Sequence, residues 1–310
     1  MTLSELKIVF MGTPEFAVAS LNALMNSGCR IVGVITAPDK PAGRGLQPNE
    51  SAVKKYARSK GLNILQPLKL KDPAFLDQLR ELNADLFVVV AFRMLPEQVW
   101  NMPPMGTVNL HGSLLPQYRG AAPINWAIIN GEKTTGVTTF RLTYEIDTGD
   151  ILMQEPFPIG DNETAGEVHD RMKEIGAKIL VQTIEGLANG TLRGKPQVSI
   201  AATTGLRQAP RIHSETCRID WNKSLDEVYN LIRGLSPYPT AFTYLNGKIL
   251  KIYKAGKEGS TDNTNPGASS TDGKTYLKFA CANGYIHALE VQLEGKKRLP
   301  VGDFLRGYRF

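Results

Sequence analysis

Short apolar runs that alternate with longer helical patterns are the feature of this chain that most constrains its fold. Runs with the β-branched composition of buried strands lie at 7–12, 31–37, 86–91 and 107–110. Helical patterns lie between them, at 52–60 and 73–82. Strands that alternate with helices in this way are typical of a parallel sheet covered on both faces. The sequence therefore predicts an α/β fold with a Rossmann-like, mostly parallel sheet.

The region that follows extends this pattern. Two strand-like runs flank the segment "TYEIDTGD" at 143–150, and a long helix is expected over 165–188. Thr164 and Glu167 have the spacing of a capping box at the start of that helix. Near the start of the chain, Thr13 is expected to be an N-cap, with Pro14 as the first helical residue.

The last third of the chain has a different composition. Residues 190–208 are rich in Gly, Pro, Ser and Thr without periodicity and are interpreted as a linker. Beyond them, Ser224 and Glu227 form a second predicted capping box, and Asn246-Gly247 and Asn283-Gly284 are hairpin signals. We expect a catalytic domain at 1–189, the linker at 190–208, and a smaller OB-like β-barrel domain at 209–310, with a mobile loop at 257–274.

Charge and cysteine content narrow the class of protein. The formal net charge of the 310 residues is +6; residues 1–206 contain twenty basic and twenty acidic side chains, so the whole excess lies in the last 104 residues. Such a basic tail favours contact with a polyanion, nucleic acid before membrane, although a solvated basic surface explains it equally well. The start has no leader-like pattern, and no stretch approaches the roughly 20 apolar residues of a membrane span. We expect a cytoplasmic monomer with reduced, buried thiols at Cys29, Cys217 and Cys281.

The stretch "VNLHGSLLPQYRGAAP" at 108–123 contains the candidate chemistry. Asn109 and His111 end a predicted strand at the edge where open parallel sheets bind ligands, and residues two apart point the same way. An amide and an imidazole at one point can stabilise an oxyanion and move a proton, as acyl transfer requires. A turn-forming Asn and a structural His are the alternative, and Asp147 in a nearby loop favours the catalytic interpretation.

Other chemistries have less support in the sequence. Ser113 lacks the Gly-x-Ser-x-Gly context of a hydrolase nucleophile. His111, Asp147 and His169 do not have metal-ligand spacing, so no metal site is expected. Gly12 stands outside any Gly-x-Gly-x-x-Gly pattern, which argues against dinucleotide binding.

"VNLHGSLLPQYRGAAP" followed by "DTGD" resembles the signature of the 10-formyltetrahydrofolate-dependent formyltransferases. "FMGTPEFA", "APDKPAGRG", "RIDW", "IRGLSPYPTA" and "FLRGY" extend the resemblance over essentially the whole chain, to members whose acceptor is methionine on initiator tRNA. The resemblance implies direct attack of the amino group on the formyl carbon, for translation initiation, with 10-formyltetrahydrofolate as co-substrate and no tightly bound cofactor. It implies that Asn109, His111 and Asp147 are catalytic.

The resemblance also implies a folate cleft. Its expected lining comes from two segments and the loop around Asp147: Phe92, Arg93, Met94 and Leu95, then Ser113, Leu114, Leu115 and Pro116. Many relatives have Tyr-Gly where this chain has Phe92-Arg93, a change that affects the backbone freedom available there.

Contacts with initiator tRNA are implied at both ends of the chain. The loop 39–48, with Lys40 and Arg44, matches a loop that wedges near the acceptor stem, although Leu46-Gln47 replace two lysines common in relatives; a loop that only covers the site is the alternative. Phe16 matches a position that packs on the methionyl side chain, and is otherwise a core residue. The expected phosphate contacts of the basic domain are Arg211, Arg233, Lys248, Lys251 and Lys254.

Two other functions remain open. A formyltransferase acting on glycinamide ribonucleotide or an amino-sugar nucleotide shares the Asn-His-Asp set but should lack the C-terminal domain. A non-catalytic tRNA-binding module explains the basic tail but leaves the three candidate catalytic residues without a role.

Overall fold

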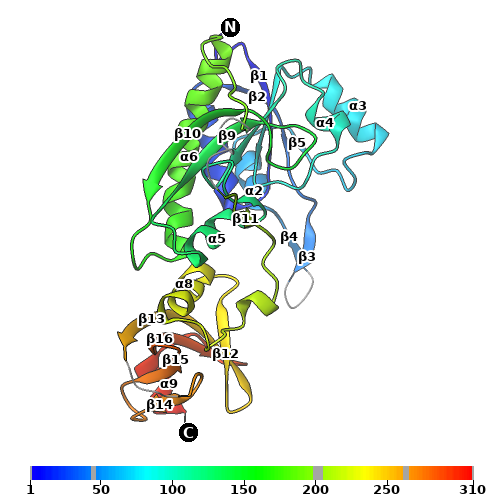
Figure 1. Cartoon of the computed structure of the whole chain (residues 1–310). Helices are drawn as coiled ribbons and strands as arrows, with labels where there is room; N and C mark the ends of the chain where they lie inside the picture. Colours follow the sequence, from blue (N-terminus) through cyan, green and yellow to red (C-terminus); the bar gives the residue numbers. More distant parts are fainter. Residues whose placement is uncertain (1, 43–46, 198–204, 261–264, 309–310) are drawn as a thin grey trace. The chain divides into compact units, whose positions relative to one another are not determined.

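The computed structural model describes residues 2–42, 47–197, 205–260 and 265–308, which form two compact units (Figure 1). Unit 1 comprises Met1–Arg119, Gly136–Pro156 and Asp170–Arg207, and unit 2 comprises Gly120–Thr135, Phe157–His169 and Gln208–Phe310. This division differs from the linear one expected from the sequence, because two segments that precede the expected linker, Gly120–Thr135 and Phe157–His169, pack in unit 2.

Unit 1 is built on a seven-stranded sheet with the strand order β10-β9-β7-β6-β1-β2-β5. The pairs β1–β2, β1–β6, β6–β7 and β2–β5 are parallel, and β7–β9 is antiparallel. The mostly parallel Rossmann-like sheet predicted from the sequence is therefore confirmed. Its strands are β1 (Lys7–Gly12), β2 (Arg30–Ile35), β5 (Ile64–Leu65), β6 (Leu86–Val90), β7 (Thr107–His111), β9 (Thr134–Arg141) and β10 (Ile151–Pro158).

Helices cover both faces of this sheet. Side chains of α3 (Pro73–Glu81) and α4 (Glu97–Trp100) pack on one face, against a core that includes Val9, Phe87 and Val89. α6 (Ala165–Ala188) meets the other face, where Gly176 lies so close to Leu110 that an added Cβ would be 2.8 Å from its side chain. The remaining helices of this unit are α1 (Glu15–Asn26) and α2 (Ala52–Ser59).

Of the helix starts predicted in the first half of the fold, that of the long helix α6 is confirmed and that of α1 is wrong. The bounds of α6 agree with the prediction, and Thr164 and Glu167 exchange capping-box hydrogen bonds. Thr13 is not the N-cap of α1: the cap is Pro14, whose ψ of 175° keeps it extended, so the helix begins at Glu15.

Unit 2 combines the helices α5, α8 and α9 with an antiparallel sheet of six strands. α5 (Pro123–Ile129) packs on α8 (Leu225–Leu235), which begins with the predicted capping box of Ser224 and Glu227. The sheet order is β12-β13-β16-β15-β14, with β17 on β16. This curled sheet is the small β domain expected from the sequence. Its strands are β12 (Ala241–Leu245), β13 (Lys248–Gly259), β14 (Ser269–Thr271), β15 (Leu277–Cys281), β16 (Gly284–Leu293) and β17 (Leu299–Pro300), and α9 (Val301–Gly307) follows.

The two Asn-Gly pairs both lie at hairpins, in different positions. Asn246 and Gly247 have φ of 49° and 76°, as a two-residue turn between β12 and β13 requires. At the second pair, Cys281 is opposite Gly284, so the turn residues are Ala282 and Asn283 and the glycine is already in β16. β13 extends to Gly259, so the expected loop at 257–274 begins within a strand; residues 261–264 lie outside the described ones.

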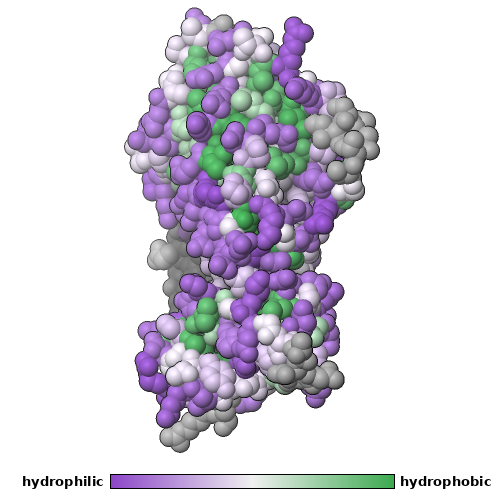
Figure 2. All heavy atoms as spheres, turned by 60° about the vertical axis from the view of Figure 1, so that its left-hand side comes forward, coloured by the Kyte–Doolittle hydropathy of each residue, from purple (hydrophilic) through white to green (hydrophobic). Residues whose placement is uncertain are grey.

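Short elements complete the described chain: β3 (Lys40–Ala42), β4 (Gln47–Asn49), β8 (Arg119–Gly120), β11 (Gln208–Ala209) and the 3-10 turn η1 (Glu215–Cys217). The face seen in Figure 2 is mainly hydrophilic, interrupted by hydrophobic patches. Among the described residues no helix is long and apolar enough to cross a membrane, and no group of three or more metal-ligating side chains is found.

Candidate active site

His111 is the last residue of β7, and the residue is 7% exposed. Leu110 points toward α6, so its neighbours Asn109 and His111 project from the opposite face, at the carboxyl end of the strand. Asn109 is half-buried and pairs in register with Val89 and Phe140. The ring of Phe140 lies edge-on to the imidazole, with centroids 6.4 Å apart. β7 therefore presents an amide and an imidazole side by side, as expected from their spacing.

The two nitrogens of His111 have different partners. Nε2 lies 2.8 Å from the carbonyl oxygen of Tyr118, and because a carbonyl can only accept, this nitrogen carries a hydrogen. Nδ1 faces Asp147, with 3.8 Å between Nδ1 and Oδ2. The backbone thus fixes the ring, and Nδ1 is the nitrogen left to gain or lose a proton beside a carboxylate.

Asp147 lies in the loop between β9 and β10 and is 9% exposed. Its φ is 53°, a left-handed conformation that non-glycine residues seldom adopt. Gly149 leaves no space for a side chain, since a Cβ there would be 1.7 Å from the carbonyl oxygen of Arg141. Tyr144 and Ile146, in the same loop, are 84% and 58% exposed. A constrained backbone therefore holds a buried carboxylate in a loop whose preceding residues, Tyr144 and Ile146, are exposed.

The first predicted folate segment, residues 113–116, is tied to β9. Ser113 is fully buried and its hydroxyl donates to the carbonyl of Gln117 at 2.6 Å. Thr138, which is opposite His111 in the sheet, donates to the carbonyl of Ser113 and accepts from the amide of Leu115. Leu115 precedes a cis peptide bond to Pro116. These bonds fix the turn directly after His111.

The second predicted folate segment, residues 92–95, is less uniform. Met94 is 75% exposed, whereas Leu95 is buried and Phe92 packs on the core. The guanidinium of Arg93 donates to the carbonyls of Leu68, at 3.0 Å, and of Pro67. Burial lowers the pKa of Arg93. Arg93 thus holds the 67–68 turn.

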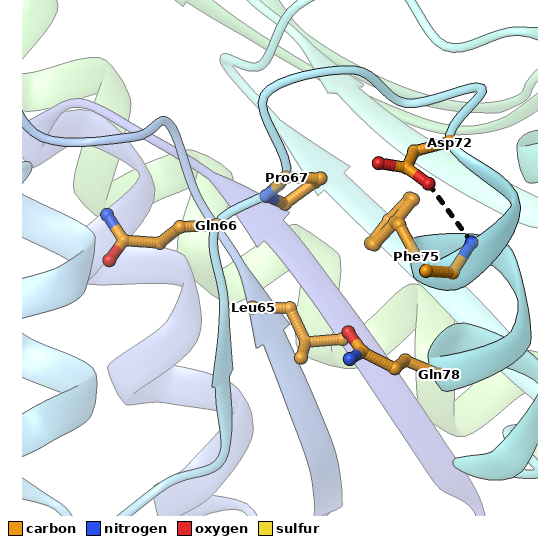
Figure 3. Close-up of a pocket in the computed structure, with 7 residues that line it drawn as sticks. Leu65, Gln66, Pro67, Asp72, Phe75 and Gln78 are labelled. Atoms are coloured by element: carbon orange, nitrogen blue, oxygen red, sulfur yellow. Dashed lines mark hydrogen bonds between the residues drawn. The ribbon is translucent and has the colours of Figure 1, made fainter.

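That turn borders a separate cavity of about 250 Å³ at the start of α3 (Figure 3). Two of its polar side chains have local partners: the carboxylate of Asp72 caps α3 by accepting from the amide of Ala74 at 3.1 Å, and Gln66 donates to the carbonyl of Ala37. The candidate catalytic residues do not line this cavity.

The residues expected to contact tRNA occupy different environments. Phe16 is 7% exposed in α1, the position of a core residue. Lys40 lies in β3, which pairs with β4 as a hairpin, and Arg44 lies outside the described residues. Arg211, Lys248 and Lys254 are exposed and Lys251 is half-buried.

The expectation that Arg233 contacts a tRNA phosphate is wrong. Its side chain is 5% exposed, and its guanidinium donates to Asn230 Oδ1 at 2.8 Å and to the carbonyls of Glu163 and Gly160 at 3.1 and 3.3 Å. Burial lowers its pKa from the ordinary value. A guanidinium enclosed in this way cannot reach a tRNA phosphate, so Arg233 is a structural residue of unit 2.

Two contributors to the site escape sequence reasoning. Tyr118 acts through its backbone carbonyl, which leaves no trace in the side-chain pattern. Gln197 is 2% exposed and donates to the carbonyls of Asp147 and Gly149, although it lies in a stretch that the sequence indicates only as a linker.

Both parts of the chain match known families. Residues 6–184 match the family model described as formyl transferase, and residues 211–309 match the formyl transferase C-terminal domain. The chain belongs to the formyl transferase family. Relatives named methionyl-tRNA formyltransferase are 50% identical in Bacteroides fragilis (99% of this chain, 97% of the relative) and 55% identical in Phocaeicola vulgatus (100% and 98%).

Solved structures share the fold at low identity. The N-formyltransferase from Helicobacter canadensis, with folinic acid and dTDP-3-aminofucose, has a TM-score of 0.69 at 22% identity, covering 91% of this chain and 98% of that one. HypX from Aquifex aeolicus with tetrahydrofolic acid has a TM-score of 0.66 at 18% identity, covering 97% of this chain and 47% of HypX.

Proposed function

We propose that this chain transfers the formyl group of 10-formyltetrahydrofolate to the α-amino group of methionyl-initiator tRNA, for translation initiation in the cytoplasm. The observation that carries the chemistry is the buried imidazole of His111, with Nε2 bound to a backbone carbonyl and Nδ1 directed at Asp147. The choice of acceptor is supported by the nearly full-length similarity to methionyl-tRNA formyltransferases, which extends through the C-terminal domain.

The reaction forms one C–N bond and breaks another. The methionyl amine attacks the formyl carbon, giving a tetrahedral intermediate with a negative oxygen; collapse breaks the bond to N10 of the folate, which takes a proton as the amine loses one. Asn109 and protonated His111 stabilise the oxyanion as donors. His111 then supplies a proton to N10 from Nδ1, since Nε2 is committed to Tyr118.

Asp147 has two roles in this scheme. Its carboxylate stabilises the imidazolium form of His111, and it accepts the proton of the attacking amine through a water. This proton then passes to Nδ1 of His111, which replaces the one given to N10 and restores both residues. The distance of 3.8 Å between Nδ1 and Oδ2 exceeds a hydrogen bond, and catalytic contacts often shorten when substrates bind. We propose that the turns 92–95 and 113–116 line the folate cleft.

We propose that the tRNA is held by nonspecific phosphate contacts of Arg211, Lys248, Lys251 and Lys254, while the segment 39–48, with Lys40 and Arg44, meets the aminoacyl end. A protein that acts on one tRNA at a time needs no second copy, and we propose a monomer.

The direct test is formyl transfer from 10-formyltetrahydrofolate to charged initiator tRNA, with elongator methionine tRNA and glycinamide ribonucleotide as competing acceptors. Selective formylation of the initiator supports the proposal. His111→Ala should abolish transfer while tRNA binding persists. Formylation of the small acceptor alone would retain the three catalytic residues and refute the tRNA acceptor, and full activity of His111→Ala would refute the mechanism.

A further inference from the structure

The described ends of the stretch 190–208 do more than connect domains. Residues up to Gln197, and again 205–207, belong to unit 1. Among the described residues of this stretch, Gln197 is the buried polar one, with 2% exposure. A buried amide is stable only when its donors and acceptor are paired, so the partners of Gln197 indicate what it holds.

All four hydrogen-bonding positions of the Gln197 amide are used. Nε2 donates to the carbonyl oxygens of Asp147, at 2.9 Å, and of Gly149, at 2.8 Å. Oε1 accepts from Nη2 of Arg119 at 2.6 Å and from Nε at 3.2 Å. Two carbonyls demand a donor and a guanidinium demands an acceptor, so the amide has a single possible orientation.

This amide therefore joins the two loops that place the candidate catalytic pair. One loop contains Asp147 in its left-handed conformation, which persists only when surrounding bonds hold it. The other runs through Tyr118 to Arg119, and the carbonyl of Tyr118 holds Nε2 of His111. Gln197 therefore bridges two backbone segments: the loop that bears the Asp147 carboxylate, and the loop whose Tyr118 carbonyl binds the His111 imidazole.

The other described end of the stretch fastens the same loop. The amide of Tyr118 donates to the carbonyl of Arg207 at 2.7 Å, and the side chain of Gln117 bonds to the backbone of Gly205 and Arg207. Both described ends thus meet residues 117–119.

We propose that Gln197 is a positioning residue for formyl transfer, which sets the separation of His111 and Asp147 by bridging their loops; this rests on the proposed function. Gln197 does not touch substrate. It acts through the carbonyls of the Asp147 loop on one side and through Arg119 on the other, so a segment outside the catalytic motifs completes the site.

The test uses the full-length protein and Gln197→Met, which keeps the volume of the side chain and removes its four bonds. Rates are expressed per tetrahydrofolate-binding site, so that inactive protein is not counted. We expect kcat to fall at least tenfold, about what a misplacement below 1 Å costs, while KM for both substrates changes less than twofold. The pH profile of kcat should also change shape, which simple loss of folded protein does not cause.

Two further variants separate the contribution of the bonds to the Asp147 loop from that of the bonds to Arg119. Gln197→Glu still accepts from Arg119 but cannot donate to Asp147 and Gly149, so it should not restore kcat. Arg119→Met should lower kcat, and adding it to Gln197→Met should lower kcat no further, since Arg119 acts through the amide.

Thr183→Val is the matched control. Thr183 is fully buried in α6; its hydroxyl donates to the carbonyl of Ile179 at 2.8 Å and lies 2.7 Å from the hydroxyl of Thr139 in β9. Its replacement costs stability, and neither partner belongs to the two loops that Gln197 bridges. A Gln197→Met enzyme with unchanged kcat and pH profile, beside an active wild type, would overturn the positioning role alone. An inactive wild type would instead refute the proposed function.

Discussion

Replacement of Arg233 by methionine separates a structural arginine from a phosphate-binding one. The substitution keeps an apolar stem of similar length and removes the guanidinium, which donates to two backbone carbonyls and to Asn230. The carbonyls of Gly160 and Glu163 lose a charged donor inside unit 2. We expect loss of stability with no effect on the electrostatics of tRNA binding.

The magnitude follows from the bonds. Hydrogen bonds to charged groups contribute about 1.5–3 kcal/mol each, and the distances of 3.1 and 3.3 Å to the two carbonyls place these at the weak end. The cost of burying the guanidinium offsets part of this gain. We expect the free energy of unfolding to fall by about 3 kcal/mol, which lowers Tm by about 10 °C for a unit of this size.

Thermal unfolding and the salt dependence of tRNA binding measure both parts. Arg211→Ala is the control, because an exposed arginine should leave Tm within about 2 °C and lower the slope of log K against log salt by about 0.9 if it contacts a phosphate. Arg233→Met should instead lower Tm and leave the slope of log K against log salt unchanged. An unchanged Tm with a slope reduced by one contact would refute our assignment of Arg233.

Three other perturbations test the structure. Gly149→Ala forces a Cβ to 1.7 Å from the carbonyl of Arg141, so the Asp147 loop must shift; transfer should fall at least about 100-fold, and a normal rate would contradict the constraint. Phe16→Ala should lower the free energy of unfolding by about 3–4 kcal/mol in a denaturant titration with little change in KM for the charged tRNA, whereas a selective KM rise would show that Phe16 meets the methionyl group. Burial raises the pKa of the Cys29, Cys217 and Cys281 thiols, so iodoacetamide should alkylate them slowly at pH 8 unless denaturant is added. Because the folded state holds these protons more tightly, their stabilising contribution is complete below the unfolded pKa of about 8.5 and declines as pH rises above it, which pH-dependent unfolding will reveal.

Local and periodic signals account for what the sequence predicts well. The bounds of α6 follow from its capping box and apolar period, and the direction shared by Asn109 and His111 follows from strand alternation. Burial of a charged side chain has no comparable signal: Arg233 is the one basic residue of an amphipathic helix, and only packing reveals that it faces backbone carbonyls. Gln197 was missed for a related reason, because two of its partners are carbonyls that any residue supplies.

The composition of unit 2 has a consequence for genetic dissection of the molecule. Cutting the gene at the linker, as the composition of residues 190–208 invites, would leave α5 on one fragment and α8 on the other. Asn125 then loses the carbonyl of Gly234, Trp126 loses that of Pro210, and Ile129 leaves the C-terminal core it packs against. Each half would expose apolar surface that the intact chain covers. The two halves should therefore be insoluble when expressed alone and soluble only when they are co-expressed. A cut at residues 190–208, where the composition suggests a domain boundary, therefore separates two parts of one hydrophobic core.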